Sequence, residues 1–337
     1  MKAVQFQQFG LEHLEIVDRP DKLLGPKQVR LRMEAASLNY RDYLLVKGSY
    51  DPKQPLPLVP LSDGAGVVIE VGSDATKFKA GDRVCPIFRQ AWISGKYKAE
   101  TRATSLGAPL DGVMSEQMVL DETGLVRIPG YLSFEEAATL PCAAVTAWNA
   151  LRVDDNVGPG STVLVQGTGG VALFALQIAK IAGAKVIITS SSDQKLERAK
   201  KMGADVTINY RTNPKWDKLV REATNGVGVD HVIEIGGAET LEPSIRSTKL
   251  SGHISLIGNV TGSVASLSLP LMFMRHLRFQ GITAGNRDSF EDMLLAMDLY
   301  KTKPVIDRIF GFGELKQALE YMASGSQFGK ICISHRK

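Results

Sequence analysis

The fold is decided by the stretch Ser161-Thr-Val-Leu-Val-Gln-Gly-Thr-Gly-Gly-Val-Ala172, in which a hydrophobic run passes through a glycine-rich turn. The run Thr162–Gln166 is short and apolar, which predicts a buried strand, and the apolar residues after the turn predict a helix. Gly167 allows a tight turn, Gly169 lets a ligand approach the backbone, and the small Ala172 permits close packing of helix on strand. The spacing matches G-x-G-x-x-[G/A], which is typical of turns that hold the pyrophosphate of a dinucleotide.

The regular alternation around this turn predicts the architecture of residues 126–283. Expected strands and helices alternate there, which indicates an α/β domain of the Rossmann type, a doubly wound parallel sheet covered by helices. The expected strands are Thr162–Gln166, Lys185–Thr189, Val206–Asn209, His231–Ile235 and His253–Ile257, with helices at Lys195–Met202 and Lys215–Thr224. A plain strand-to-helix turn is the alternative for the glycine stretch, but this context favours a cofactor site.

The remaining segments predict a second, β-rich domain. Residues 1–125 carry short β runs separated by Gly and Pro, which favours a compact, barrel-like β domain. These runs are Gln28–Met33, Gly66–Val71, Arg83–Cys85 and Gln117–Leu120. In residues 284–337 we expect a return to this domain through helices at Phe290–Leu299 and Gly313–Ala323 and a final strand at Lys330–Ile333.

The stretch Arg89–Gly112 has little periodicity and many small or charged residues. Such a stretch predicts a long loop or mobile insertion. It is interpreted either as a solvated surface excursion or as a lid or subunit contact.

Composition and charge limit the class of protein. With 337 residues, 44% hydrophobic and 23% charged, the chain has an ordinary globular composition and a length that favours two domains. The net charge of +4 is dispersed, so no nucleic-acid partner is implied. The N-terminus lacks the pattern of a signal peptide and no long uncharged run follows, so we expect a cytoplasmic protein without a membrane partner. Three widely separated cysteines favour reduced thiols over disulfides.

The end of the second expected parallel strand indicates which dinucleotide binds. NAD-preferring sites place Asp or Glu there to bond the ribose 2′-hydroxyl, whereas this chain has Thr189-Ser190-Ser191-Ser192. Hydroxyls do not repel a 2′-phosphate and Lys195 offers it a positive charge, so we predict NADPH as the cofactor. The nearby acid Asp193 is interpreted as a helix N-cap. Lys195 has the alternative of a solvated helix residue.

Other candidate cofactor contacts follow from the expected sheet. The turn residue Thr168 and the backbone N–H groups of Gly170 and Val171 lie where a helix begins, and helix N-termini stabilise phosphate charge. Tyr210 follows the third strand, where an adenine-side ring fits, although a surface turn explains it equally well. Ile257-Gly258 ends a parallel strand, and such ends bind ligands in open sheets.

The chain also resembles a known family. The motifs that carry the resemblance occur in order and are Leu38-Asn39-Tyr40-Arg41-Asp42, Val71-Gly72 with Gly81-Asp82-Arg83-Val84, Leu140-Pro-Cys-Ala-Ala-Val-Thr-Ala147 and Gly167–Ala172. Together they resemble the medium-chain dehydrogenase/reductase superfamily, in its zinc-independent branch of quinone oxidoreductase-like and alcohol dehydrogenase-like proteins. The resemblance covers nearly the whole chain. It implies a GroES-like catalytic domain, an inserted Rossmann domain and a homodimer or homotetramer.

The positions of the family's catalytic zinc ligands are altered. Zinc members have Cys, His and Cys where this chain has Asn39, Ser62 followed by Asp63, and Cys142. One thiolate does not complete a site that needs three protein ligands and a water. The region Arg89–Gly112, which holds four structural cysteines in zinc members, contains none. We therefore expect no metal and interpret Cys142 as a small buried hydrophobe.

The resemblance implies roles for residues outside the glycine turn. Tyr50 is similar in position to the tyrosine proposed as proton donor in related enoyl reductases, and a phenol is protonated at neutral pH. Packing beside a turn is the alternative for Tyr50. Asn39, Tyr40 and Arg41 are implied to lie beside the nicotinamide ribose and phosphates, and Thr146 near the nicotinamide.

For three further residues the sequence gives a weaker indication of a role in the site. Phe88 matches a residue that lines the substrate pocket in the family and Trp92 is expected nearby, with core packing as the alternative for both. Lys330 is a candidate pyrophosphate contact, with the start of an edge strand as its alternative.

These features predict an NADPH-dependent, zinc-independent oxidoreductase that transfers hydride to a quinone or an α,β-unsaturated carbonyl. Asn39, Arg41 and Tyr50 are its candidate catalytic residues. One alternative is an NADP(H)-dependent alcohol dehydrogenase or carbonyl reductase without zinc. A non-catalytic NADPH-binding sensor or structural protein is the alternative of another class.

Overall fold

The computed structural model describes residues 1–336, which form two compact units. One unit contains Met1–Val145 together with the described residues from Ala284 onward, and the other contains Thr146–Thr283. The first boundary thus lies after Val145 and corrects the boundary after residue 125 that was expected from the sequence.

Residues 126–145 belong to the first unit because their elements pack on its strands. Strand β7 (Leu125–Arg127) pairs with β5 (Arg83–Pro86), and helix α3 (Phe134–Ala138) contacts β3 (Gln28–Ser37) and β4 (Asp63–Val71). The boundary itself falls inside a continuous helical run. This run consists of the π-helical turn η3 (Leu140–Ala144), α4 (Val145–Trp148) and the π-helical turn η4 (Asn149–Val153).

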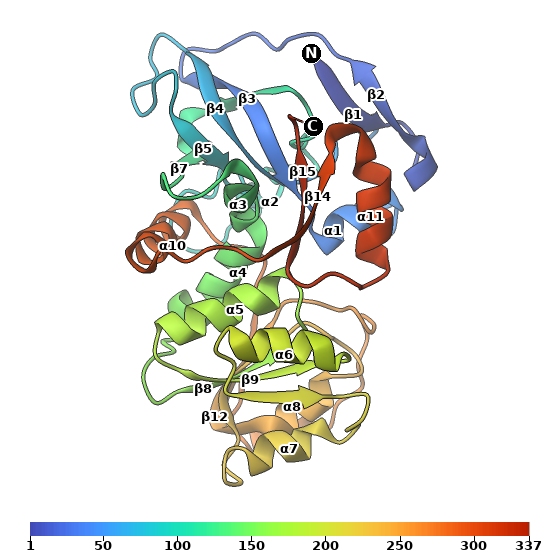
Figure 1. Ribbon diagram of the computed structural model, residues 1–337, viewed down its shortest axis with the longest axis vertical. Coiled ribbons are helices and arrows are strands. Elements are labelled where there is room, and N and C mark those ends of the chain that lie inside the picture. Colours follow the sequence, from blue (N-terminus) through green and yellow to red (C-terminus); the bar gives the residue numbers. More distant parts are fainter. Residues whose placement is uncertain (337) are drawn as a thin grey trace. The chain divides into compact units, whose positions relative to one another are not determined.

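The Thr146–Thr283 unit confirms the predicted Rossmann sheet. Its strands are β8 (Thr162–Gln166), β9 (Lys185–Ser190), β10 (Val206–Asn209), β11 (Val229–Glu234), β12 (Thr248–Leu256) and β13 (Arg278–Gly281). Its other helices are α5 (Gly170–Ile181), α6 (Asp193–Lys201), α7 (Trp216–Glu222), α8 (Leu241–Ser247) and α9 (Leu269–Phe273). The strands are parallel in the order β10-β9-β8-β11-β12-β13, with α5 and α6 on one face and α7 and α8 on the other (Figure 1).

The sheet of this unit is held by apolar residues that alternate along its strands. Leu164, Ile187, Val232 and Ile254 are fully buried and face the helices α7 and α8 through one cluster with Val220. Strand β8 is an inner strand with four of its five residues buried, and such strands read as continuous apolar runs, which is why the sequence identified β8 with its observed ends. Strand β13 was not predicted, because Arg278-Phe-Gln-Gly281 alternates weakly and lies at the sheet edge.

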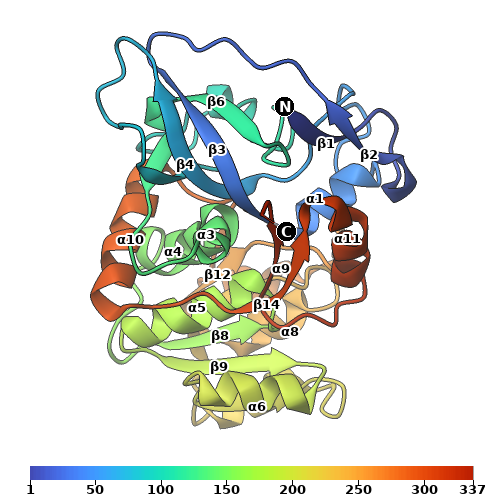
Figure 2. The ribbon, with the colours of Figure 1, turned by 45° about the horizontal axis from the view of Figure 1, so that its top comes forward.

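The first unit contains a β-rich sheet, as predicted. Its remaining strands are β1 (Lys2–Phe6), β2 (Leu14–Asp18), β6 (Gln117–Asp121), β14 (Ile306–Gly311) and β15 (Lys330–Ser334). The main sheet has the order β14-β15-β3-β4-β5-β7, β6 pairs with β3, and β1 and β2 form a separate antiparallel pair. Figure 2 shows β3 between β4 and β6.

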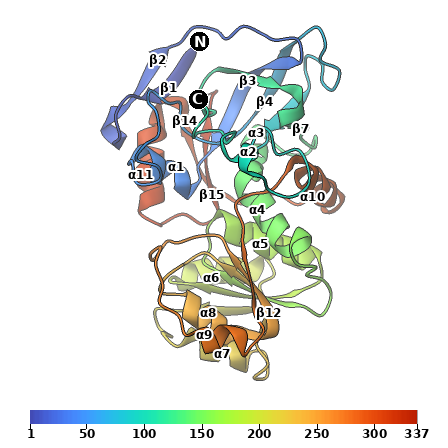
Figure 3. The ribbon, with the colours of Figure 1, turned by 180° about the vertical axis from the view of Figure 1, so that it is seen from behind.

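The C-terminal segment completes the first unit, also as predicted. The helices of this unit are α1 (Tyr40–Val46), α2 (Ala99–Arg102), α3, α10 (Arg287–Tyr300) and α11 (Leu315–Ala323), with short 3-10 turns η1 (Leu11–His13), η2 (Glu122–Gly124) and η5 (Phe312–Glu314). Helix α11 lies beside α1 and against β14 and β15 (Figure 3). Strand β15 is parallel to β14 and antiparallel to β3, so it is an inner strand. Within residues 1–336, no helix combines the length and the apolar character that crossing a bilayer requires.

The stretch Arg89–Gly112 is more ordered and more buried than a solvated excursion. It contains only the short helix α2, but Trp92 and Leu106 are buried. The Trp92 carbonyl accepts a hydrogen bond from Arg287 N at 3.0 Å, and the Gly95 carbonyl accepts one from Asn286 Nδ2 at 3.1 Å. These bonds attach the stretch to the beginning of α10, and the stretch is a long loop, as one of the two expectations held.

Candidate functional site

The glycine turn between β8 and α5 leaves its backbone open to a ligand. Gly167 has φ +75°, a left-handed conformation that favours glycine, and its N–H donates to the Thr189 carbonyl at 2.8 Å. A Cβ added at Gly167 or Gly169 would meet no atom within 4 Å, so the surface beside the turn is free. The first N–H groups of α5, including those of Gly170 and Val171, have no partner within the helix. The turn therefore fits the pyrophosphate of a dinucleotide.

Two threonines predicted at the cofactor site are buried within their unit. Thr168 is 6% exposed and Thr146 is 3% exposed. The role of both threonines in binding a cofactor stays a prediction.

The serines after β9 present hydroxyl groups at the edge of the sheet. Ser190 is buried and its hydroxyl accepts from Ser192 N at 3.3 Å, whereas Ser191 is partly exposed. Tyr210 is 42% exposed and its N–H donates to the Ser190 carbonyl at 3.1 Å. Ser190, Ser191 and Tyr210 therefore meet at the carboxyl ends of β9 and β10.

The N-cap of α6 differs from the prediction. Ser192, and not Asp193, caps the helix, because its hydroxyl accepts from Lys195 N at 3.4 Å. Asp193 instead accepts from Asn209 Nδ2 at 2.8 Å. Asp193 thus bonds the end of β10, and Lys195 lies in the first turn of α6 with a partly exposed side chain.

Ile257 and Gly258 follow β12 in a loop joined to the end of β11. Both N–H groups donate to the Glu234 carbonyl, at 2.9 Å and 3.2 Å. A Cβ at Gly258 would lie 2.4 Å from the Ile235 carbonyl oxygen, so this close approach requires glycine. Both residues lie at the carboxyl ends of the parallel strands, where the sequence analysis expected them.

In the first unit, a continuous hydrogen-bonded network joins Asn39, Ser62, Asp63, Cys142 and Lys330. Asn39 Nδ2 donates to Ser62 Oγ at 3.3 Å, and Ser62 Oγ donates to Asp63 Oδ1 at 2.8 Å. The second oxygen of Asp63 accepts from Cys142 N at 2.9 Å. Lys330 Nζ donates to Asn39 Oδ1 at 2.6 Å and to the Leu38 carbonyl at 2.5 Å.

Lys330 therefore has a different position from the one predicted. Its side chain is 3% exposed and its ammonium bonds within the first unit, which explains its place on the inner strand β15. The edge-strand interpretation is corrected, because β15 lies between β14 and β3, and the contact with the pyrophosphate stays a prediction. The ammonium supplies positive charge next to Asp63.

Burial controls the acid–base state of this network. Burial raises the pKa of Asp63 above its ordinary value, and Lys330 only partly offsets this effect. Burial likewise raises the pKa of the neighbouring Asp42 to about 6, against the influence of Arg41. Burial raises the pKa of the Cys142 thiol to about 12, so the thiol is protonated at neutral pH.

Arg41 is held between two aromatic rings. Its guanidinium carbon lies 5.0 Å from the ring centre of Tyr50 and 5.0 Å from that of Phe88. Its Nη atoms donate to the carbonyls of Leu106 and Ala108, at 3.1 Å and 3.3 Å. Tyr50 is 51% exposed, so the phenol has one side against a cation and the other in solvent.

Of the other predicted site residues in the first unit, two are buried and one is exposed. Phe88 and Trp92 are 5% and 7% exposed, and the Arg89 guanidinium lies 5.1 Å and 5.8 Å from their ring centres. Tyr40 is 43% exposed at the start of α1. The structure thus brings Arg41, Tyr50 and Phe88 together, while Asn39 belongs to the Lys330 network.

Comparisons with known proteins agree with this architecture. Residues 25–130 match the family described as alcohol dehydrogenase GroES-like domain, and residues 170–298 match zinc-binding dehydrogenase. A zinc-type alcohol dehydrogenase-like protein of Schizosaccharomyces pombe is 44% identical over 97% of this chain and 95% of its own length. Quinone oxidoreductase-like protein 2 of Mus musculus is 31% identical over 95% of this chain and 87% of its own length. A putative alcohol dehydrogenase from Sinorhizobium meliloti superposes with TM-score 0.93 at 40% identity, covering 99% and 98% of the two chains.

The chain belongs to the medium-chain dehydrogenase/reductase superfamily. It is an oxidoreductase of this superfamily, whose members bind a nicotinamide dinucleotide. The open glycine turn fits that cofactor. The donor set Asn39, Ser62 and Cys142 does not fit the catalytic zinc of the superfamily, because an amide and a hydroxyl stand in place of two zinc ligands and the single Cys142 thiol does not complete the site.

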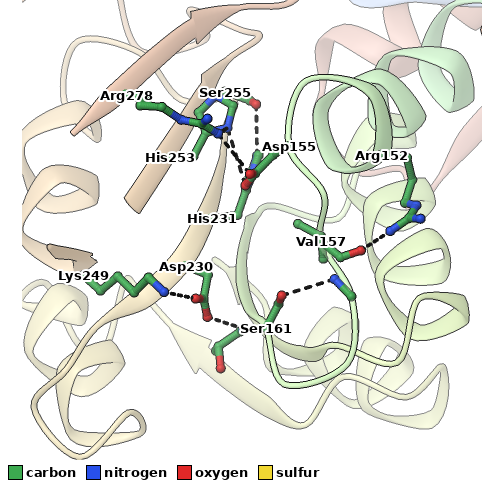
Figure 4. A network of polar contacts seen from close by, with 12 residues as sticks. Arg152, Asp155, Val157, Ser161, Asp230, His231, Lys249, His253, Ser255 and Arg278 are labelled. Carbon is green, nitrogen blue, oxygen red and sulfur yellow. Dashed lines mark hydrogen bonds and ion pairs between the residues drawn. The ribbon is translucent and has the colours of Figure 1, made fainter. Parts of the chain in front are cut away.

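Sequence reasoning missed one polar cluster in the Rossmann unit of this superfamily member. His231, His253 and Arg278 are register partners on the adjacent strands β11, β12 and β13. Asp155, in the segment after η4, contacts them (Figure 4). Asp155 Oδ2 lies 2.7 Å from His231 Nδ1, and the two imidazole rings are 4.6 Å apart. A signal was present, because the expected strands both began with a histidine and adjacent parallel strands place such residues side by side.

Arg278 supplies a positive charge to this cluster. Among residues 1–336, Asp155, His231 and His253 bring three potential metal-ligand atoms within 4.8 Å of one another. Arg278 Nη2 already lies 3.0 Å from Asp155 Oδ1 and 3.1 Å from His253 Nδ1. The guanidinium of Arg278 therefore already bonds two of the three groups that could hold a metal.

The cluster predicts a specific dependence of stability on pH. Burial lowers the pKa of His231 below its ordinary value although Asp155 opposes this effect, so the folded state favours the neutral ring. The stability that this group contributes is present above its unfolded pKa and is lost as pH falls through the lower folded value. We expect His231→Gln to lower the free energy of unfolding at pH 7.5 by about 1–3 kcal/mol and to weaken its decrease between pH 7.5 and 5.5, measured by urea unfolding.

The exposed His13 provides the control, because His13→Gln should leave the wild-type dependence on pH unchanged. Parallel pH curves for wild type and His231→Gln would contradict this interpretation of the cluster.

Proposed function

We propose that this chain is an NADPH-dependent reductase that works without zinc and reduces quinones or α,β-unsaturated carbonyls. One observation carries the proposal: at the positions that hold catalytic zinc in the superfamily, Asn39, Ser62 and the Cys142 N–H are joined through Asp63 in a hydrogen-bonded network that Lys330 completes. The resemblance to quinone oxidoreductase-like proteins supports this substrate class.

NADPH, when bound, supplies the hydride. The protein's own groups bind and orient the cofactor, since the open glycine turn leaves room for the pyrophosphate and the first N–H groups of α5 donate hydrogen bonds to it. In the first unit Tyr50 donates the proton that completes the reduction, and Arg41 holds the phenol in place through ring contact. Orientation of the substrate then contributes much of the rate.

A second candidate is carbonyl reduction by the same residues. It is favoured by the resemblance to proteins named alcohol dehydrogenase, including the Sinorhizobium meliloti structure. Hydride would then reach a carbonyl carbon, with Tyr50 again as proton donor. A panel of quinones, enones, aldehydes and ketones separates the two candidates by their kcat/KM values.

The first test is activity after removal of metal. We expect chelator-treated enzyme to oxidise NADPH with at least one quinone or enone at the untreated rate, because no proposed step needs a metal ion. NADPH oxidation is followed at steady state, with metal content measured in parallel. Loss of activity that returns with added zinc would overturn the proposal, and tight NADPH binding without any turnover would favour the non-catalytic alternative.

Replacement of the proton donor gives a second test. We expect Tyr50→Phe to lower kcat about tenfold to a hundredfold while the Kd for NADPH stays unchanged, because general acid catalysis is lost and binding is not. Tyr43→Phe, in helix α1 that precedes Tyr50, is the control and should retain wild-type kcat. Equal kcat values for wild type and Tyr50→Phe would remove Tyr50 from the reaction.

The preference for NADPH over NADH is tested at Ser191, the partly exposed serine that follows β9. We expect Ser191→Asp to lower kcat/KM for NADPH by about tenfold or more and to leave NADH less affected, because a carboxylate repels the 2′-phosphate. Ser268→Asp, an exposed change elsewhere in the Rossmann unit, controls for added charge. A wild-type enzyme that uses NADH as well as NADPH would contradict the proposed cofactor.

A further inference from the structure

A fully buried carboxylate stands at the carboxyl end of β11. Glu234 is 0% exposed and it is satisfied by neutral donors. Its Oε1 accepts from Gly237 N at 2.9 Å and from Thr240 Oγ1 at 2.5 Å. Its Oε2 accepts from Gln166 Nε2 at 2.7 Å and also from Ser244 Oγ. Four donors on three separate elements therefore point at one side chain.

Gln166 connects this carboxylate to the glycine turn. It is the last residue of β8 and directly precedes Gly167, and its side chain is 6% exposed. Its Oε1 accepts from the N–H groups of Ile235 and Gly236, each at 3.0 Å. The amide of Gln166 thus has one end on Glu234 and the other on the backbone that follows β11.

The loop after β11 is in turn bonded to the loop after β12. Gly236 O accepts from Thr261 N at 2.7 Å, and Ala238 N donates to Gly262 O at 3.1 Å. A Cβ at Gly237 would lie 2.6 Å from the Gly262 carbonyl oxygen, so the two loops pass too closely for any side chain there. Residues 235–240 and 257–262 therefore form one rigid assembly, which we call the paired loops.

We propose that Glu234 and Gln166 are positioning residues for the nicotinamide half of the dinucleotide, acting through the paired loops without touching the cofactor. This inference rests on the proposed function. The paired loops lie at the carboxyl ends of β11 and β12, the edge at which open parallel sheets bind ligands. The adenine end lies at β9 and β10, where Ser191 and Tyr210 are located. The carboxylate therefore sets the shape of one half of the site only.

The chemistry of the four donors explains why a carboxylate is needed. An ionised carboxylate is an acceptor at both oxygens, whereas a glutamine amide offers one acceptor and one donor group. In Glu234→Gln the amide N–H would face another donor, either Gly237 N–H or Gln166 Nε2. One of these groups must move, and both belong to the structure that holds the paired loops.

The test uses binding by the intact chain, measured by calorimetry. For Glu234→Gln we expect the Kd for NADPH to rise about tenfold or more, with kcat at saturating NADPH within about threefold of wild type. Adenosine 2′-monophosphate, which probes only the adenine end, should bind with a Kd within about threefold of wild type. Hydrogen exchange at the N–H groups of residues 235–237 should accelerate.

Two further variants keep the test decisive. Thr240→Val removes a single donor and should raise the Kd for NADPH by a smaller factor, even where Glu234→Gln folds poorly. Gln166→Met should resemble Glu234→Gln, and the double variant should be no worse than either alone, because the two residues act as one unit. Ser247→Ala, which removes a hydrogen bond to the Pro243 carbonyl in α8, is the matched control and should leave Kd unchanged.

A purely structural role gives a different result. If Glu234→Gln lowers the melting temperature while the Kd for NADPH stays at the wild-type value, the inference is overturned. An equal loss of affinity for adenosine 2′-monophosphate also overturns it, since the whole unit is then loosened. Failure of the proposed function is distinguishable, because it is measured on wild type, which would then bind no NADPH, turn over no acceptor or require zinc, whereas this inference is measured on the ratio of variant to wild-type Kd.

Discussion

The requirement that a buried carboxylate be compensated shapes both units of this protein. An isolated charge away from water is strongly unfavourable, so each such group must gather donors or a cation around it. Asp63 has the Ser62 hydroxyl, the Cys142 N–H and the nearby Lys330 ammonium. Glu234 has neutral donors alone. The partly buried Asp155 has two imidazoles and a guanidinium.

The Lys330 network also explains how the first unit keeps its local structure without zinc. A metal ion joins residues that are distant in sequence, and here the side chain of Lys330 on β15 bonds the segment at the start of α1. Asn39 accepts from this ammonium and donates to Ser62. A chain of hydrogen bonds therefore connects Lys330 to the Cys142 N–H through Asn39, Ser62 and Asp63. This arrangement supports a reaction in which organic groups alone assist hydride transfer.

Sequence patterns predicted those parts of the fold that repeat a local rule. The apolar runs of β8 and β10 and the glycine turn carry their structure in short stretches, so the Rossmann sheet was found with nearly correct limits. Strands β7 and β14 were missed because they are stabilised by pairing with distant partners and by few apolar residues of their own. For the same reason the boundary of the first unit was placed too early.

The residues of the candidate site likewise fall into those that a local motif predicts and those that depend on distant contacts. The positions of Gly167, Ser191 and Gly258 follow from motif and strand order, and the structure places them at the carboxyl ends of the sheet. The roles of Lys330 and Gln166 depend on contacts across the sheet, which no local pattern contains. His231 and His253 could be predicted in part. Their strands were predicted, but the sequence analysis did not infer that the two histidines lie side by side on adjacent strands.

The position of β15 has a consequence for how the protein is made. The end of β3 pairs with β15, with Ala35, Ala36 and Ser37 opposite Ser334, Ile333 and Cys332, respectively. The hydrogen bond from Ser37 Oγ to the Ile331 carbonyl spans 294 residues. During synthesis the Rossmann unit is complete in the nascent chain while this end of β3 still has bare backbone donors and acceptors. An unpaired strand edge of this kind attracts other chains. Ribosome-bound chaperones are therefore expected to matter more for the amino-terminal half than for the unit inserted into it.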